Sequence, residues 1–212
     1  MGGSAIINNS ITGYYPDDTF LDYSGNGNDG TISDITTAAI PTGVRSGVFD
    51  GSASSCSVGT SLVTGNAFTF MVWMMTDDYT TQQIIMDARP SAGVDGLISI
   101  QINANLLDCH IWSEFKKNYV GATTLASDTW FHVACTWDGT NLKIYLNGEE
   151  DTPYTKISDD AVTLSDTSQE MYIGSYNGAT VQFDGELNDS ILLNRALTAQ
   201  QIKQIYKRTY RS

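Results

Sequence analysis

Basic residues are scarce in this chain of 212 residues, which has 11 Lys and Arg against 24 Asp and Glu. The formal net charge is therefore -13 at pH 7, and the sequence pI is about 4.2. Proteins that bind nucleic acids carry a basic surface that neutralises phosphate groups. A chain with so large an acidic excess is not expected to bind nucleic acid.

Long apolar runs are also missing, because no stretch approaches the roughly 20 residues that a membrane-spanning helix needs. The first basic residue is Arg45, whereas a standard secretory signal begins with a basic segment. We therefore expect neither membrane insertion nor a standard export signal. The location stays open, with a virion surface or an extracellular site favoured.

Cysteine and proline are sparse as well. The cysteines, Cys56, Cys109 and Cys135, lie far apart and form no Cys-x-x-Cys motif, so a zinc or redox site is not indicated. Buried free thiols and synthesis in a reducing compartment are the favoured interpretation. Only 4 prolines occur and no repeat or linker marks a boundary. We expect one domain over 1–212, with an N-terminal segment at 1–12 and a C-terminal helix and basic tail at 198–212.

Alternating apolar and polar residues predict β-hairpins. In LISIQINANLLDCHIWS, residues 97–113, apolar side chains take every second position on each side of Ala104 and Asn105. Folding the segment there pairs 102 with 107, 100 with 109 and 98 with 111, so that apolar residues face apolar residues. Residues 130–148 repeat this pattern around the turn DGTN. Two hairpins with one apolar face each indicate two sheets packed face to face.

Two other segments complete the predicted fold. AFTFMVWMM, residues 67–75, lacks alternation and predicts a strand buried on both sides. Only LTAQQIKQIYKR, residues 197–208, is typical of a helix: Thr198 and Gln201 have capping-box spacing, and Ile202, Ile205 and Tyr206 form an apolar stripe. The expected fold class is all-β, an antiparallel β-sandwich (jelly roll) with a short C-terminal helix.

Five segments resemble, in order, the motifs of laminin G-like domains, which belong to the concanavalin A-like lectin and glucanase superfamily. They are GYYPDDTFLDYSGNGNDGT (13–31), SGVFDG (46–51), FTFMVWM (68–74), WFHVACTWDGTNLKIYLNG (130–148) and FDGELNDSILLNRALTAQQIKQIY (183–206). The resemblance covers nearly the whole chain and implies the jelly-roll fold. It leaves the activity open, because this fold occurs in lectins, carbohydrate-binding modules, hydrolases, adhesion domains and virion proteins.

The resemblance also implies a structural calcium ion. In the family, an aspartate-led Gly/Asn loop near the N terminus commonly meets a C-terminal turn or strand around Ca²⁺, which prefers six to eight oxygen ligands. Candidate ligands are Asp22, Asn26 and Asn28 in DYSGNGNDG (22–30), together with Asn188, where relatives usually have aspartate. Asn188 lowers the charge of such a site, and Asn-Gly-rich loops also form tight turns without a metal.

Catalysis is not expected. Hydrolases of this superfamily carry Glu-x-Asp-x-Glu on one strand, which places carboxylates on one face. The nearest match, residues 186–190, has Glu, Asn and Ser at alternate positions, so a glycoside hydrolase that depends on Glu186 is disfavoured. His110 and His132 are the only histidines, and no nucleophile-elbow motif accompanies them.

The polar side of the first predicted hairpin instead suits sugar binding. A flat Trp112 ring would cover the apolar face of a pyranose, while amides and a carboxylate would bind its hydroxyls. Asp87 and Arg89 add candidates from a rim loop, where Arg89 would pair with an acidic sugar or with Asp87. In the alternative, Trp112 only covers the sheet and its neighbours are solvated. The candidates on the hairpin are Gln101, Asn103, Asp108, His110 and Trp112.

The favoured function is a non-catalytic glycan-binding or adhesion domain with glycans or glycoconjugates as partners. The alternative is an assembly protein, such as a virion decoration or fibre component, that contacts other virion or cell-surface proteins or a second copy of this chain. That hypothesis rests on the free cysteines, the absence of an export signal, and a basic tail on an acidic body. The basic residues of the tail are Lys203, Lys207, Arg208 and Arg211.

Overall fold

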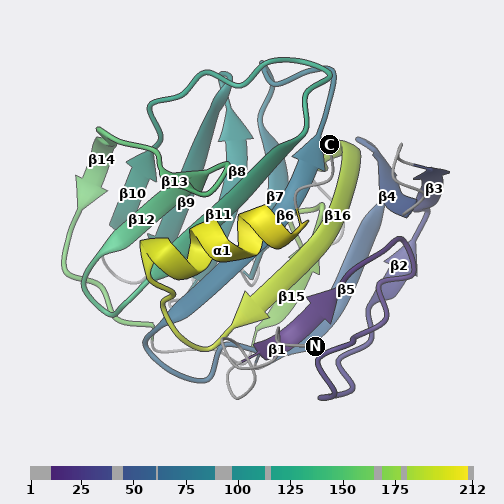
Figure 1. Ribbon diagram of the computed structural model, residues 1–212, viewed down its shortest axis with the longest axis horizontal. Helices are drawn as coiled ribbons and strands as arrows, with labels where there is room; N and C mark the ends of the chain where they lie inside the picture. Colours follow the sequence, from purple (N-terminus) through teal and green to yellow (C-terminus); the bar gives the residue numbers. More distant parts are fainter. Residues whose placement is uncertain are drawn as a thin grey trace.

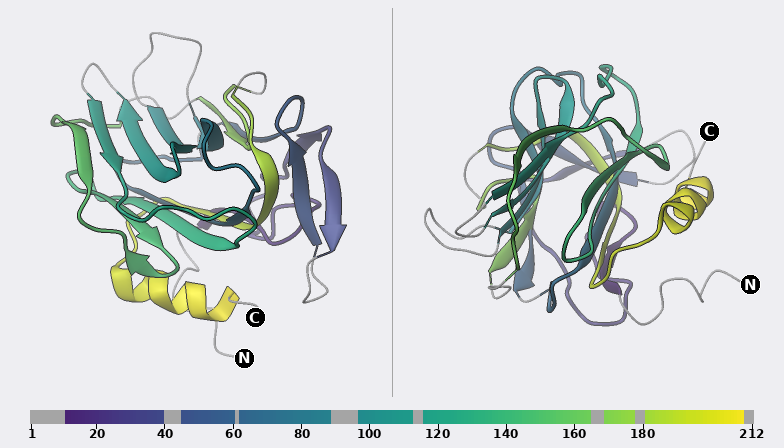
Figure 2. Two further views of the ribbon diagram at one scale, coloured as in Figure 1. Left: turned by 90° about the horizontal axis from the view of Figure 1, so that it is seen from above. Right: turned by 90° about the vertical axis from the view of Figure 1, so that its left-hand side faces the viewer.

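The computed structural model of the protein describes residues 11–39, 45–60, 62–88, 97–112, 116–164, 169–177 and 181–209. Within these ranges, two antiparallel sheets of eight strands each face one another, and one helix lies outside them (Figure 1). Figure 2 shows the two layers and the helix on the outer side of one of them. The predicted all-β sandwich with a C-terminal helix is thereby confirmed.

Sheet A has the strand order β13-β12-β11-β6-β16-β4-β3, and β1 also pairs with β16. Its strands are β1 (Ile11–Tyr15), β3 (Thr36–Ala39), β4 (Arg45–Asp50), β6 (Phe68–Met75), β11 (Phe131–Trp137), β12 (Leu142–Leu146), β13 (Glu149–Glu150) and β16 (Asp184–Leu193). Sheet B has the order β14-β10-β9-β8-β7-β15-β5-β2. Its strands are β2 (Thr31–Ser33), β5 (Ser55–Thr60), β7 (Gln83–Asp87), β8 (Leu97–Asn103), β9 (Leu106–Trp112), β10 (Lys116–Val120), β14 (Thr155–Asp159) and β15 (Glu170–Ile173).

The two predicted hairpins form in the predicted register. In β8–β9, Ile98 lies opposite Ile111, and the pairs 100–109 and 102–107 follow. Ala104 and Asn105 both have positive φ, at 50° and 67°, which is the backbone conformation that a two-residue hairpin turn requires. In β11–β12, the pairs 133–146, 135–144 and 137–142 place apolar residues opposite each other. The side-chain alternation therefore determined the register of both hairpins.

The apolar faces of the two sheets meet in one core. Ile98, Ile100 and Ile102 of β8 lie in the same buried cluster as the apolar residues of β11. Burying such a side chain contributes roughly 1.5–3 kcal/mol each. Cys56, Cys109 and Cys135 are all free and buried, which confirms the interpretation of the cysteines as buried thiols.

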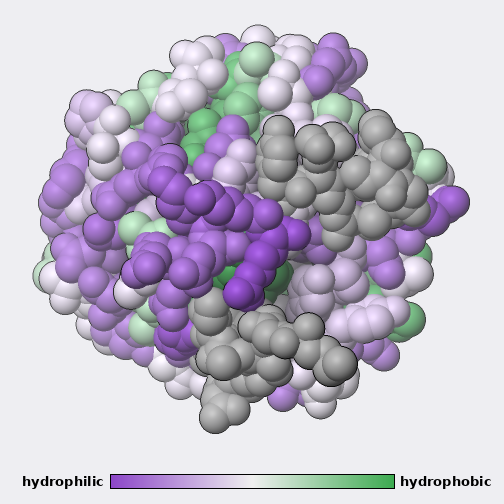
Figure 3. All heavy atoms as spheres, viewed as in Figure 1, coloured by the Kyte–Doolittle hydropathy of each residue, from purple (hydrophilic) through white to green (hydrophobic). Residues whose placement is uncertain are grey.

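Helix α1 (Ala199–Thr209) explains why β6 lacks alternation. One face of β6 contributes Phe70 and Val72 to the core between the sheets, while Met71 on the other face packs in a cluster with Ile202 and Ile205 of α1. The predicted capping box forms, because Thr198 N donates to Gln201 Oε1 at 3.0 Å and Gln201 N donates to Thr198 Oγ1 at 3.3 Å. The outward side of α1 is hydrophilic (Figure 3).

No helix in the described ranges has the length and apolar character needed to cross a bilayer.

Candidate functional site

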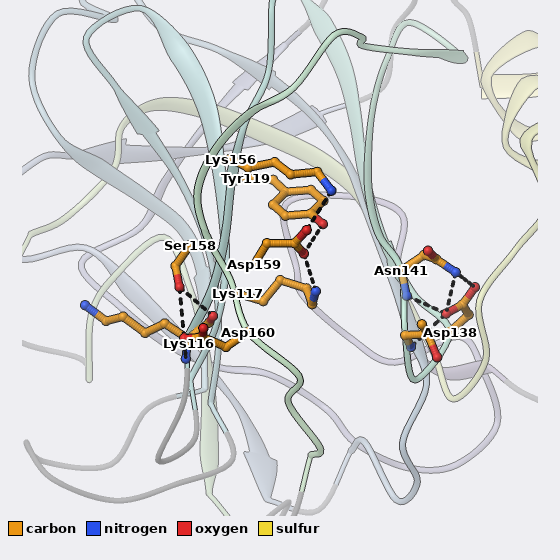
Figure 4. Close-up of polar contacts among 10 residues, drawn as sticks. Lys116, Lys117, Tyr119, Asp138, Asn141, Lys156, Ser158, Asp159 and Asp160 are labelled. Atoms are coloured by element: carbon orange, nitrogen blue, oxygen red, sulfur yellow. Dashed lines mark hydrogen bonds and ion pairs between the residues drawn. The ribbon is translucent and has the colours of Figure 1, made fainter.

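A cavity of about 370 Å³ lies between the β10 and β14 edge of sheet B and the turn that follows β11 in sheet A. Its volume falls in the range of roughly 300–1,000 Å³ that is typical of small-molecule sites. We call it the β10–β14 cavity, and Figure 4 shows its polar groups. Its lining residues are Lys117, Tyr119, Trp137, Gly139, Thr140, Asn141, Lys156, Asp159, Asp160, Ala161 and Val162.

A β-bulge in β14 places the charged groups on the cavity side. Lys117 lies opposite Asp159 and Tyr119 lies opposite Lys156, with a register shift between Asn118 and Tyr119. Lys156 and Asp159 are three residues apart, so a regular strand would direct them to opposite faces of the sheet. The bulge leaves the extra residue, Ile157, out of the ladder. The side chains of Lys156 and Asp159 therefore both reach the cavity.

Asp159 is the centre of the polar network in the cavity. Lys117 Nζ lies 2.5 Å from its Oδ1, Lys156 Nζ lies 2.7 Å from its Oδ2, and the Tyr119 hydroxyl donates to Oδ1. The hydrogen bonds from Lys117, Lys156 and Tyr119 hold the pKa of Asp159 well below its usual range. The carboxylate in turn raises the pKa of Lys156. Asp159 and Lys156 thus remain ionised at neutral pH.

Two buried aromatic rings, Tyr119 (5% exposed) and Trp137 (0% exposed), lie beneath the cavity as its apolar floor. Lys117 Nζ lies 5.5 Å from the centroid of the Tyr119 ring and 5.7 Å from that of Trp137, within reach of cation–π attraction. Trp137 is fixed from behind, because its Nε1 donates to Asn66 Oδ1 at 3.1 Å. Tyr119 stacks on Tyr154 with a centroid distance of 5.5 Å. Neither ring can therefore move without disturbing the core.

The opposite wall is the tight turn between β11 and β12. Asp138 accepts hydrogen bonds from Thr140 N at 2.9 Å and from Asn141 N at 2.7 Å. Gly139 has φ 94°, a conformation that side-chain-bearing residues rarely adopt. The turn therefore presents Thr140 and Asn141, which are both exposed, to the cavity.

Two lysines, Lys117 and Lys156, line this cavity, whereas Lys116 and Lys143 are not among its lining residues. Four of the six lysines in the sequence, Lys116, Lys117, Lys143 and Lys156, lie on β10, β12 and β14. Nothing in our sequence predictions pointed to the cavity, although Lys117 and Tyr119 alternate in KKNYV and would share one face of a strand. That alternation is the feature of the sequence that could have indicated the cavity.

The predicted binding residues on the β8–β9 hairpin do come together, but they are buried. Asp108 Oδ1 lies 2.9 Å from His110 Nε2, and Gln101 Nε2 lies 3.0 Å from Asp108 Oδ2. Gln101 and Asp108 are each 4% exposed and His110 is 9% exposed, whereas Asn103 is exposed. The side-chain alternation predicted this shared face correctly, but it did not reveal the burial. The three side chains form an internal hydrogen-bonded network.

Of the remaining predicted binding residues, only Asp87 has a side chain that the structure describes. Asp87 is fully buried at the end of β7, opposite Ser99 of β8. Arg89 and the side chain of Trp112 lie outside the described residues.

Residues 50–203 match the family model of laminin G-like domains described as the concanavalin A-like lectin/glucanases superfamily. The chain belongs to this superfamily. No match was found among curated protein sequences.

Solved structures with the same fold include several sugar-binding proteins. Domain 4 of AbnA, an extracellular arabinanase from Geobacillus stearothermophilus solved in complex with arabinotriose, is 20% identical, with a TM-score of 0.74 and coverage of 92% of this chain and 98% of that one. A botulinum neurotoxin type C structure, whose title describes interaction with two ganglioside molecules, is 16% identical at TM-score 0.73. The alignment covers 99% of the present chain and 53% of that toxin chain. The binding domain of botulinum neurotoxin DC, solved with rat synaptotagmin II, is 15% identical at TM-score 0.73, with coverage of 96% and 52%. At these identities the likeness establishes the fold alone.

The calcium ligands implied by the family resemblance are engaged in other contacts. Asp22 Oδ1 accepts hydrogen bonds from Tyr14 N at 3.0 Å and Ser24 N at 2.8 Å. Its Oδ2 accepts from Ser24 Oγ at 2.7 Å and Asn28 N at 3.0 Å. Four donors use the roughly four lone-pair sites of a carboxylate. Burial alone would raise the pKa of Asp22, but these hydrogen bonds outweigh it and lower the pKa.

The amides of this set also bind backbone carbonyls. Asn26 Nδ2 donates to Ile11 O at 2.8 Å and Asn28 Nδ2 to Thr12 O at 2.6 Å. Asn188 Nδ2 donates to Arg45 O at 2.6 Å, on β4. Asp22 fits a turn that closes without a metal better than it fits a calcium site, whereas the contacts of the three asparagines use their amide nitrogens and not the oxygens that would bind calcium. The calcium ion remains a prediction from the resemblance.

The residues considered for catalysis have structural contacts. Glu186 accepts a hydrogen bond from Ser46 Oγ, and Asp189 has φ 51° within an irregular stretch of β16. His132 lies in an aromatic cage, with its ring centroid 5.4 Å from Trp73 and 5.7 Å from Tyr206 of α1. Burial lowers the pKa of His132 to about 4. The imidazole is therefore neutral and enclosed under α1.

Proposed function

We propose that the protein is a non-catalytic carbohydrate-binding module whose ligand enters the β10–β14 cavity. The main support is that one cavity of about 370 Å³ combines an apolar floor with ammonium, carboxylate, hydroxyl and amide groups. Sugars present apolar C–H faces together with a rim of hydroxyl groups, and they are bound by such a mixture. Membership of a lectin-containing superfamily and the sugar complexes of similar folds agree with this proposal.

The polar groups of the cavity have distinct tasks in this proposal. Asn141 and Thr140 lie on the exposed turn and offer amide and hydroxyl groups to the ring hydroxyls of a sugar. Lys156, whose side chain is 50% exposed, donates from the opposite wall. Tyr119 and Trp137 keep the floor apolar and rigid, so the site changes little on binding and loses little conformational entropy.

The cavity is not arranged for hydrolysis. Retaining and inverting glycosidases need one carboxyl group that is protonated at neutral pH and a second that is ionised. Three donors hold Asp159 in its ionised form, so it cannot serve as the general acid. Asp160 accepts hydrogen bonds from Lys116 N at 3.2 Å and from Ser158 Oγ at 3.1 Å, groups outside the cavity lining.

A glycan array followed by calorimetric titration of the best sugar tests this function. Asn141→Ala and Lys156→Ala each remove one polar group from an exposed cavity wall, and each is expected to weaken binding roughly tenfold, since one hydrogen bond contributes about 1.5 kcal/mol. Asn103→Ala serves as the matched control, because Asn103 is exposed on the β8–β9 hairpin, away from the cavity lining.

Binding that both cavity variants retain while Asn103→Ala loses it would move the site to the hairpin. Absence of binding to any glycan on the array would reject the function itself.

A further inference from the structure

Lys117 is a buried cation with unused hydrogen-bond donors. Its side chain is only 6% exposed, and its Nζ donates to Asp159 at 2.5 Å. Asp159 is the only hydrogen-bond acceptor of this ammonium group among the described residues. A lysine ammonium carries three N–H donors, so two of them remain for a ligand. Burying charged donors without acceptors costs free energy, and a ligand that supplies acceptors recovers it.

Lys117 and Lys156 are also spaced to bracket a carboxylate. Lys117 binds Oδ1 of Asp159 and Lys156 binds Oδ2, so one ammonium group lies on each oxygen of the same carboxylate. The Tyr119 hydroxyl adds a third donor to Oδ1. Figure 4 shows that both lysine side chains point toward the open side that faces Asn141.

The acidic charge of the whole molecule bears on where an anionic ligand can bind. The chain carries a net charge of -13, so an anionic ligand is repelled over most of its surface. The charged residues that line the cavity balance, with Lys117 and Lys156 against Asp159 and Asp160. An acidic sugar therefore meets less repulsion here than on the rest of the protein.

From these contacts we infer that the sugar bound in the β10–β14 cavity bears a carboxylate, as uronic and sialic acids do, and that Lys117 and Lys156 bind this carboxylate. The inference rests on the proposed function and specifies its ligand class. Asp159 keeps the two ammonium groups in position before the ligand arrives. Its own negative charge limits the affinity for an acidic sugar.

Matched acidic and neutral sugars test the inference on the full chain. Galacturonate oligosaccharides are compared with their methyl esters, and sialyllactose is compared with lactose, by calorimetric titration at low and high salt. The acid form of the sugar that binds is expected to bind roughly tenfold or more tightly than its neutral partner, and added salt should reduce this preference. Lactose sulfate is included to separate carboxylate from sulfate recognition.

The variants assign the preference to residues. Lys117→Met keeps the approximate length of the side chain but removes its charge, and it should weaken binding of the acid more than binding of the neutral partner. Lys156→Gln, at a more exposed position, should reduce the preference without unfolding the protein. Asp159→Asn removes the competing charge and should tighten binding of the acid severalfold.

The outcomes separate the two proposals. Equal affinity for acid and neutral partners, or tighter binding of the sulfate than of the carboxylate, overturns the ligand class but leaves carbohydrate binding intact. If no sugar binds, the proposed function fails. If Lys117→Met weakens the acid and neutral partners equally and Lys156→Gln leaves the preference unchanged, the two lysines do not recognise the carboxylate.

Discussion

At the scale of single residues, Asp22 stabilises the loop over residues 22–30. Its carboxylate receives four hydrogen bonds, from Tyr14, Ser24 and Asn28. These bonds connect β1 to a loop that is rich in Gly and Asn, and they offset the entropy lost when such a loop is ordered.

Replacing Asp22 with Ala should therefore destabilise the protein. We expect a loss of roughly 2–3 kcal/mol, because several backbone donors lose a charged acceptor at once. Urea denaturation measures the change. The control is Asp17→Ala, because Asp17 lies in a turn nearby and, among the described residues, accepts hydrogen bonds only from Thr19. A loss below that of the control would show that the four bonds are not stabilising.

The same contacts predict the response to calcium. Since all four lone-pair sites of Asp22 receive donors, millimolar calcium or EDTA should leave the melting temperature unchanged. A calcium-dependent rise in the melting temperature that Asp22→Ala abolishes would establish the metal site that the family resemblance implies.

His132 predicts a pH dependence of stability. Burial lowers its pKa from 6.5 to about 4, so the unfolded chain takes up a proton at a pH where the folded protein does not. Stability is full above pH 6.5 and falls by roughly 3 kcal/mol as the pH drops from 6.5 to 4. Denaturation of the wild type and of His132→Phe across this window measures the effect. Parallel profiles for the two proteins would contradict it.

At the scale of secondary structure, the bulge in β14 accommodates one extra residue and so keeps Lys156 and Asp159 on the cavity side. The pairs 117–159 and 119–156 flank Ile157, which is 65% exposed and has no partner in the ladder. Without Ile157, the same residues would pair in a regular ladder, with Lys156 and Asp159 still on one face.

Deleting Ile157 should therefore preserve both ligand binding and stability. Ile157→Ala, which keeps the bulge and removes the exposed side chain, is the control. Thermal denaturation and titration with the bound sugar measure the result. If the deletion abolishes binding while Ile157→Ala retains it, the bulge has a role beyond the alternation of side chains.

Helix α1 is held to sheet A by a few apolar side chains. Ile202 is fully buried against sheet A, whereas the neighbouring Lys203 forms an exposed ion pair with Glu149. We expect Ile202→Ala to cost about 2–4 kcal/mol and Lys203→Ala to cost less than about 1 kcal/mol. Chemical denaturation of both variants tests this difference. Equal losses would mean that α1 is not anchored by its apolar face.

At the scale of the whole molecule, local patterns were enough to predict the layers but not the site. The alternation in 97–113 and 130–148 gave both hairpin registers, and Thr198 and Gln201 gave the start of the helix. The cavity instead depends on β10, β14 and the β11–β12 turn meeting in space. The bulge at Ile157 and the burial of Gln101 and Asp108 follow from contacts between distant segments, which a side-chain pattern does not contain.

The positions of the lysines relative to one another are also visible only in the three-dimensional structure. The lysines at 116, 117, 143 and 156 are spread over 41 positions of the sequence, yet β10, β12 and β14 bring them to one edge of the sandwich. Of these four, Lys117 and Lys156 line the β10–β14 cavity, which is where the proposed acidic sugar would bind.

Mapping a bound sugar by NMR chemical-shift perturbation tests the central claim most directly. The claim predicts that titration with the tightest-binding glycan shifts the amide signals of Lys117, Tyr119, Asn141 and Lys156, all of which line the β10–β14 cavity. Shifts confined to the β8–β9 hairpin around Asn103, with the cavity signals unchanged, would contradict it.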